Sequence, residues 1–178
     1  MKKSKVAVSL SVAALIGALL APTFSFAQAS KFQNMLVQAQ VNVNCNFTST
    51  PTTNFPSYDP ADVNALPANP LVGSVVVDVR CTRGATVTIG IDNGANGPAA
   101  ATLGLSTRAM KSGTFYLAYD FYKDTTYTTP WTNSSPGWYS FTSGSNASTS
   151  VPIYGRVPGG QDIPAGTYQD TVQVTVNY

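Results

Sequence analysis

The last nine residues of this 178-residue chain alternate between apolar and polar side chains. In the sequence DTVQVTVNY (170–178), Val172, Val174, Val176 and Tyr178 fall on one face of an extended backbone, and polar side chains fall on the other. Because a terminus with so regular a pattern is normally tied into a sheet, we predict a β-strand here. The pattern leaves open whether this strand is central in its sheet or lies at an edge with one side unpaired.

A longer alternation of the same kind occupies residues 35–47. Its apolar face is formed by Met35, Val37, Ala39, Val41, Val43, Cys45 and Phe47. Gln and Asn dominate the opposite face. These thirteen residues are about twice the usual length of a strand. The segment is therefore expected to be either one long strand or two pieces with separate roles.

Shorter alternating segments predict further strands at 72–81, 85–91, 114–122 and 150–157. Turn-forming Gly, Asn and Pro residues separate them, and the proline-rich stretch 48–70 is expected to be a loop. The chain is rich in Thr, Ser, Val and Tyr and shows no convincing 3.6-residue apolar period, which disfavours helices. Short strands separated by turns at intervals of about ten residues predict an all-β sandwich.

The first residues have the composition of a secretory signal peptide. Lys2, Lys3 and Lys5 precede an apolar run at 6–21, and small residues follow around Ala27 and Ala29. A membrane anchor is the alternative, but the run is short for a span. We expect residues 1–29 to be removed after Ala27 or Ala29, which lowers the formal net charge from +2 to −1. This charge gives no reason to expect nucleic acid or an anionic membrane surface as a partner.

The chain has two cysteines, Cys45 and Cys81, and in an exported protein such a pair most simply forms a disulfide. A metal site is disfavoured because the chain has no His and only these two thiols. Without His, with scattered Asp residues and without a GxSxG or SxxK motif, the sequence does not indicate an enzyme. We expect no catalytic residue and no cofactor.

The two ends of the mature chain have complementary patterns. The segment SKFQNMLVQAQ (30–40) is an apolar alternation without an obvious partner in its own domain. The C-terminal strand carries neither charge nor Pro from Val172 to Tyr178, so nothing in its sequence blunts an open edge. The segment of one chain can therefore complete the sheet of the next by β-strand addition. Since donor and acceptor are different surfaces, the product is an open head-to-tail filament.

Three stretches, AYDFYKD (118–124), VPIYGRVP (151–158) and GTYQDTVQVTVNY (166–178), resemble the spore coat protein U domain, which the major pilins of archaic chaperone–usher pili share. The resemblance covers essentially the whole mature chain, and residues 48–70 and 125–146 depart from it most. It implies an incomplete immunoglobulin-like β-sandwich that is completed by a donated strand and carries one disulfide. It divides the chain into a signal peptide at 1–29, a donor extension at 30–40 and the pilin domain at 41–178.

The resemblance also implies roles for individual residues. Met35, Val37 and Ala39 are the expected donor side chains, and Phe32 or Leu36 would serve if the register is shifted by one residue. The expected acceptor edge consists of Val172, Val174, Val176 and Tyr178, with Val41 and Val43 as the opposite wall. The disulfide between Cys45 and Cys81 would tether the first strand to the next.

The function that follows is that of a structural pilin subunit in an extracellular pilus that supports surface attachment and biofilm formation. The implied partners are identical or homologous subunits, a periplasmic chaperone and an outer-membrane usher, and the expected route is secretion through the periplasm to the cell surface. A secreted carbohydrate-binding β-sandwich, or a coat or matrix protein of the same family that assembles differently, is the alternative.

Overall fold

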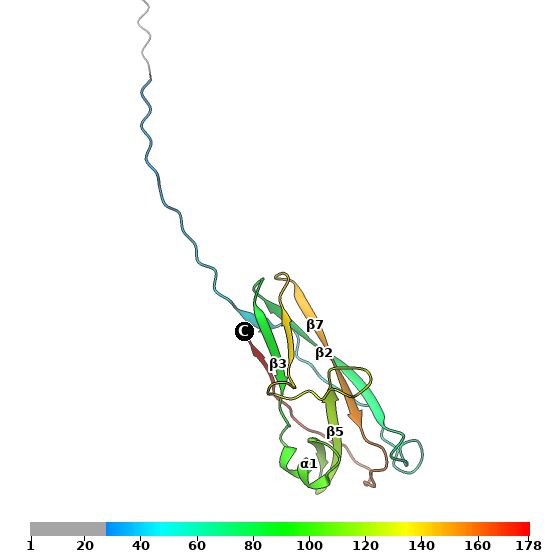
Figure 1. The fold of residues 1–178 in the computed structure, drawn as a ribbon. Helices are drawn as coiled ribbons and strands as arrows, with labels where there is room; N and C mark the ends of the chain where they lie inside the picture. Colours follow the sequence, from blue (N-terminus) through cyan, green and yellow to red (C-terminus); the bar gives the residue numbers. More distant parts are fainter. Residues whose placement is uncertain (1–27) are drawn as a thin grey trace, which may run out of the picture. The chain divides into compact units, whose positions relative to one another are not determined.

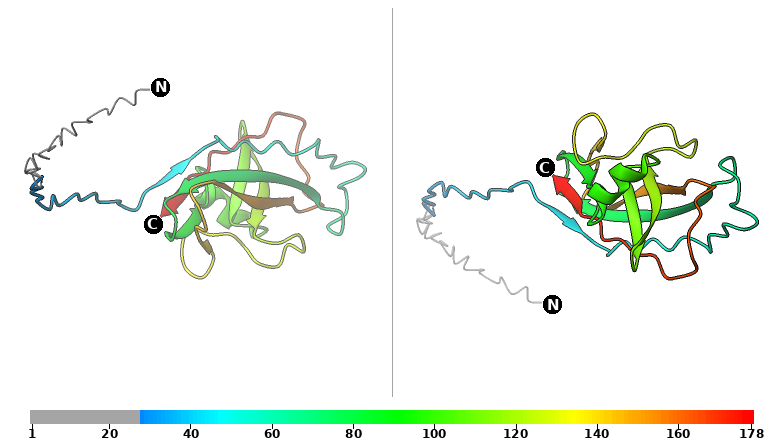
Figure 2. Two further views of the ribbon diagram at one scale, coloured as in Figure 1. Left: turned by 90° about the horizontal axis from the view of Figure 1, so that it is seen from above. Right: turned by 90° about the horizontal axis from the view of Figure 1, so that it is seen from below.

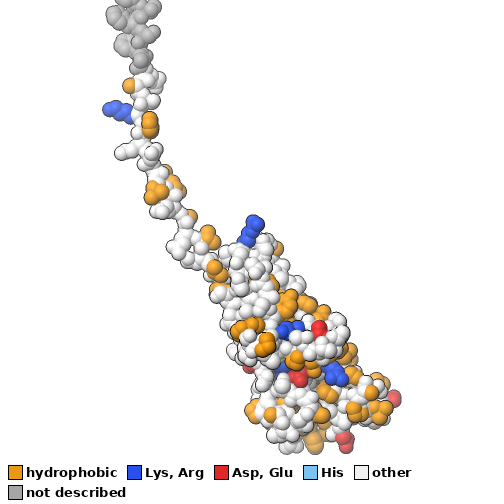
Figure 3. All heavy atoms as spheres, viewed as in Figure 1, with side chains coloured by type: hydrophobic (Ala, Val, Ile, Leu, Met, Phe, Trp, Pro, Cys, Tyr) orange, Lys and Arg blue, Asp and Glu red, His pale blue; other side chains and the backbone are white. Residues whose placement is uncertain are grey.

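The structure is a computed structural model that describes residues 28–178. Most of the expected signal peptide, at 1–27, lies outside the described residues. The chain divides into two units, Met1–Ala39 and Gln40–Tyr178. In the first unit, the described residues 28–39 form no helix or strand, and every one of them is exposed. Hydrophobic side chains are spaced along this segment (Figure 3).

The second unit consists of two antiparallel sheets and one short helix (Figure 1). The larger sheet has the order β1 (Cys45–Phe47), β2 (Leu71–Cys81), β7 (Ser148–Val157), β5 (Phe115–Tyr122) and β4 (Arg108–Ser112). The smaller sheet has the order β6 (Tyr139–Thr142), β3 (Thr86–Ile91) and β8 (Val174–Asn177). The red C-terminal strand β8 lies beside the green strand β3 (Figure 2).

The inward faces of the two sheets form one hydrophobic core. Val77 and Val79 of β2, Ile89 of β3 and Ile153 of β7 are buried in it, as their alternation predicts. Trp131, from the connection between β5 and β6, is fully buried, and its indole N–H donates a hydrogen bond of 2.9 Å to the carbonyl of Ile89. A two-layer core of this kind confirms the prediction of an all-β sandwich.

The disulfide is also confirmed. Cys45 of β1 and Cys81 of β2 lie directly opposite each other in the ladder and are bonded. Because β1 is only three residues long and pairs with β2 alone among the described strands, this bond fixes the start of the domain to a long central strand. The first strand is therefore tethered to the next, as the sequence implied.

Two predicted strands are shorter in the structure than in the sequence pattern. Of the alternation at 35–47, only Cys45–Phe47 forms a strand, because no other part of the described chain pairs with residues 35–43. At the C-terminus the strand begins only at Val174, because the chain crosses from one sheet to the other just before it.

The helix α1 (Gly97–Leu103) was not predicted. Its start coincides with the sequence Asn96–Gly97–Pro98, which is also typical of a turn, and Gly104 ends it in the left-handed conformation with φ 66°. No helix in residues 28–178 is long and apolar enough to cross a membrane.

Candidate functional site

Strand β8 has one open edge. Among the described strands it pairs with β3 alone. Just before β8, the amide of Gln173 donates to the Asp92 carboxylate at 2.8 Å, and the carbonyl of Gln173 accepts from the Asp92 amide at 3.1 Å. Because backbone groups alternate in direction along a strand, those of Val172, Val174 and Val176 point to the other side, where no described strand lies.

Near the open edge lies a hollow with a volume of about 1010 Å³. Its floor is part of the core: Ile91 of β3, Leu117, Tyr119 and Phe121 of β5, and Ile153 of β7 all line it. Its walls are two segments that belong to no strand, 51–58 and 163–172. We call this hollow the groove. Since core side chains line its floor, filling it with apolar groups would remove further apolar surface from water.

The wall at 51–58 is attached to the domain by two aromatic side chains. The ring of Phe55 makes an edge-to-face contact with Tyr119, with 6.1 Å between the centroids. The hydroxyl of Tyr58 donates to the carbonyl of Pro158 at 3.2 Å and accepts from the amide of Gln161 at 2.9 Å. The sequence predicts a loop over 48–70 but not that part of this loop forms a wall of the groove. The available signal was a pair of aromatic residues between prolines in an otherwise polar segment.

The wall at 163–172 runs from the larger sheet to the smaller one. Gln169 exchanges two backbone hydrogen bonds, of 2.8 and 3.1 Å, with Lys111 at the edge strand β4. Two residues later, the carbonyl of Thr171 accepts from the amide of Ala95, which follows β3, at 2.9 Å. Of the described residues that line the groove, Asp170, at the crossing, is the one that carries a charge.

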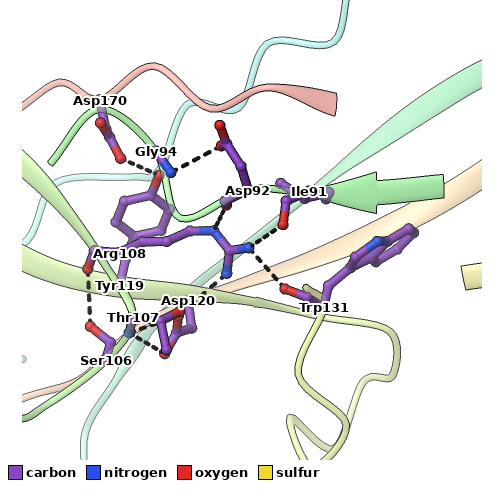
Figure 4. Close-up of polar contacts among 10 residues, drawn as sticks. All are labelled: Ile91, Asp92, Gly94, Ser106, Thr107, Arg108, Tyr119, Asp120, Trp131 and Asp170. Atoms are coloured by element: carbon purple, nitrogen blue, oxygen red, sulfur yellow. Dashed lines mark hydrogen bonds and ion pairs between the residues drawn. The ribbon is translucent and has the colours of Figure 1, made fainter. Parts of the chain in front are cut away.

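A buried arginine supports the end of β3 (Figure 4). Arg108 of β4 donates from Nε to the carbonyl of Asp92 at 2.7 Å. Its Nη2 donates to the carbonyls of Ile91 and Trp131 at 2.9 and 2.8 Å. Its Nη1 lies 3.4 Å from Oδ1 of Asp120, so the buried charge is paired and hydrogen-bonded. The guanidinium therefore joins the larger sheet to the end of β3, where β8 pairs.

Burial changes the ionisation of this cluster. It lowers the pKa of Arg108, and the Asp120 carboxylate opposes that effect. Burial also raises the pKa of Asp120, while hydrogen bonds from Thr107 and the charge of Arg108 act in the opposite direction. For Tyr119, burial and the neighbouring Asp170 carboxylate both raise the pKa. These groups are bonded to one another, which gives their shifts a structural explanation, although Tyr119 and Asp170 also line the groove.

The structure places the expected acceptor residues unequally. Val172, Val174 and Val176 pack against the core, and the first two line the groove, whereas Tyr178 is 58% exposed. Val41 and Val43 do not line the groove; they are 82% and 54% exposed, and the wall facing 163–172 is formed by 51–58 instead.

All the expected donor residues lie in residues 28–39, the segment that forms no helix or strand. They are Phe32, Met35, Leu36, Val37 and Ala39. Four of these side chains, all but Ala39, are large and 77–92% exposed. These exposed apolar side chains are spaced along a segment whose described residues form no helix or strand.

Comparison with known proteins agrees with this architecture. Residues 31–175 match the family model of the Spore Coat Protein U domain. The chain is 35% identical to "Protein U" of Myxococcus xanthus over 178 residues, which cover 97% of this chain and 99% of that protein.

A solved structure has a similar fold. It is the crystal structure of the CsuC–CsuE chaperone–tip adhesion subunit pre-assembly complex from archaic chaperone-usher Csu pili of Acinetobacter baumannii, with a TM-score of 0.50 and 24% identity. The match covers 78% of this chain and 40% of the matched chain. At this identity the likeness describes the fold. With the family match covering most of its length, the chain belongs to the Spore Coat Protein U domain family.

Proposed function

We propose that this chain is a structural pilin subunit that polymerises by donating residues 30–40 to the groove of the next subunit. The observation that carries the proposal is the coexistence of an open edge on β8, a groove floored by core side chains and an exposed apolar segment elsewhere in the same chain. An isologous contact would use the same surface on both subunits and would stop at a dimer. Here the two contacting surfaces differ, so each added subunit leaves a free surface for the next one.

The donor segment suits an extended site. Met35, Val37 and Ala39 alternate on one face, as a strand placed against β8 requires. A shift of one residue would present Phe32 and Leu36 instead. Three or four apolar side chains buried at about 1.5–3 kcal/mol each contribute on the order of 5–12 kcal/mol before the ladder bonds and the ordering costs are counted. The inserted strand would leave only when the sandwich opens, so the polymer would persist for kinetic reasons.

Partners and location follow from the same proposal. A subunit with an unfilled groove exposes core residues, so a periplasmic chaperone would occupy the groove until an outer-membrane usher exchanges it for the next donor segment. The relation of the fold to a chaperone–tip adhesion subunit complex supports this route. The product would be an extracellular pilus on the cell surface that supports attachment and biofilm formation.

The test compares the full chain with a variant that lacks residues 30–40. We expect thin fibres of the exported full chain in electron micrographs and none of the deletion variant. A synthetic peptide of residues 28–40 should raise the melting temperature of the deletion variant, and the same peptide with its residues scrambled should not. A deletion variant that stays folded and monomeric, with the same stability with or without peptide, would overturn the proposal.

A coat or matrix protein that assembles differently is the second candidate. The family description and the 35% identity to Protein U over nearly the whole chain favour it. Such a protein would form sheets or amorphous deposits in which removal of residues 30–40 does not prevent assembly. Electron microscopy of the same two variants therefore separates the candidates.

A further inference from the structure

The wall at 163–172 changes sheets within a few residues and has no described strand on its outer side. Gln169 still pairs with β4, while Gln173 already pairs with Asp92 beyond the end of β3. In a complete sandwich, a neighbouring strand would help to hold such a crossing in register. Here backbone hydrogen bonds to Lys111, Ala95 and Asp92 hold the crossing on one side, and side chains add further contacts.

Asp170 makes the first of these contacts, at the crossing point (Figure 4). Its Oδ2 accepts a hydrogen bond from the hydroxyl of Tyr119 at 2.9 Å. Its Oδ1 accepts from the side-chain amide of Asn96 and from the backbone amide of Thr171, each at 2.9 Å. Gly94, with φ +74°, lies so close to this carboxylate that a Cβ there would collide with it. The Asp170 side chain is thus hydrogen-bonded to β5, to the loop before α1 and to the backbone amide of the next residue.

Asp92 makes the second contact. Its Oδ1 accepts from the amide of Gln173 at 2.8 Å and from the amide of Gly94 at 2.9 Å. Its own carbonyl accepts from Nε of Arg108 at 2.7 Å. The side chain of Asp92 therefore supplies a hydrogen bond to the backbone just before β8, and Arg108 holds Asp92 in turn. We call Asp92 and Asp170 with these partners the carboxylate anchor.

We propose that the carboxylate anchor fixes the register of the wall and of β8 before a donor strand arrives, so that Asp92 and Asp170 act as positioning residues for strand exchange. This inference rests on the proposed function. Val172 and Val174 line the groove, and a slip of one residue at 170–173 would turn them away from it. If the register of the acceptor is already fixed, the acceptor loses less conformational entropy when the donor strand binds.

The test measures capture of a fluorescent peptide of residues 28–40 by the freshly isolated monomer of the full chain. Tyr119→Phe keeps the ring in the groove floor and removes only the bond to Asp170. We expect this variant and Asp170→Ala to capture the peptide at least tenfold more slowly, with peptide release unchanged within twofold. Asp170→Asn keeps an acceptor oxygen and should show an intermediate rate.

Tyr122→Phe is the matched control, because Tyr122 lies on the same strand β5 as Tyr119 but is not part of the groove lining. It should capture the peptide within twofold of the wild-type rate. Equal capture rates for Tyr119→Phe and Tyr122→Phe would overturn the inference, and so would a loss confined to peptide release.

Amide hydrogen exchange gives a second measurement that needs no donor. Protection of the Thr171 and Gln173 amides should fall at least tenfold in Tyr119→Phe and stay unchanged in Tyr122→Phe. If the wild-type chain fails to capture the peptide, the proposed function fails, while this comparison still decides whether the anchor fixes the wall. Unchanged protection in Tyr119→Phe would refute the anchor.

Discussion

Gly73 of β2 and Gly155 of β7 lie directly opposite each other in the ladder, and the ring of Phe55 occupies the space that their missing side chains leave. A Cβ on Gly155 would come within 2.6 Å of the ring, and one on Gly73 within 3.1 Å. The wall at 51–58 belongs to no strand, so this ring is one of its main attachments to the larger sheet. The paired glycines therefore shape the groove without lining it.

Replacing Gly155 with Ala should displace the Phe55 ring and lower the free energy of unfolding by about 1–3 kcal/mol, as overpacking of a core does. Urea denaturation of the purified protein measures the loss. Gly144→Ala is the control, because nothing lies within 4 Å of a Cβ at that position. The same denaturation midpoint for both variants would show that the space beside Gly73 and Gly155 does not hold the Phe55 ring.

Removing the disulfide with the double substitution Cys45→Ser and Cys81→Ser should destabilise the domain. The two residues are 36 positions apart, and a loop of this size corresponds to about 3–4 kcal/mol in the chain-entropy description. Urea denaturation with and without a reducing agent measures the effect. The reductant should shift the wild-type midpoint to that of the variant and leave the variant unchanged; an insensitive wild-type protein would contradict the prediction.

Val37→Asp should prevent filament formation, whereas Gln38→Asp should allow it. Val37 is 77% exposed and outside the domain, so neither change should alter the stability of the sandwich. A carboxylate at position 37 would be buried without a partner in the groove, at a cost of several kcal/mol, while one at position 38 would point away from it. Sedimentation and electron microscopy measure assembly. Equal effects of the two changes would argue against the proposed donor face.

Tyr119 should make the stability depend on pH above 10. Burial and the Asp170 carboxylate raise the pKa of Tyr119 above its ordinary value of 10.0. The folded protein therefore keeps a proton that the unfolded chain has lost, so the stabilisation is complete below pH 10 and declines as the pH rises further, by up to about 1.4 kcal/mol per pH unit. Urea denaturation between pH 9 and 11 should show a shallower decline for Tyr119→Phe. Parallel curves would contradict this assignment.

The sandwich and its disulfide could be predicted from the sequence because alternation and cysteine pairing are local signals. The alternation at 35–47 also marked a strand former, yet most of it stays unpaired, since pairing depends on a partner that the described chain does not provide. The pattern DTVQVTVNY predicts one apolar face, and Val174 and Val176 of β8 and Val172 just before it do pack against the core, whereas Tyr178 is exposed.

The groove itself was not predictable in the same way. Its wall at 51–58 has no period, and its position depends on Phe55 meeting two glycines that are 82 positions apart in the sequence. Arg108 lies outside the strands that the sequence predicts, and its four partners come from three separate segments. Contacts of this kind join residues that are far apart in the sequence, so the pattern of neighbouring residues does not predict them.

The groove and the donor segment are different parts of one chain, and this asymmetry would give a polymer polarity. One terminus of the assembled chain of subunits would display an empty groove and the other an unused segment, so the two would not be chemically equivalent. A variant without residues 30–40 could block elongation at the segment-bearing terminus and nowhere else. The length of the assembly would then be set by the ratio of intact to truncated molecules.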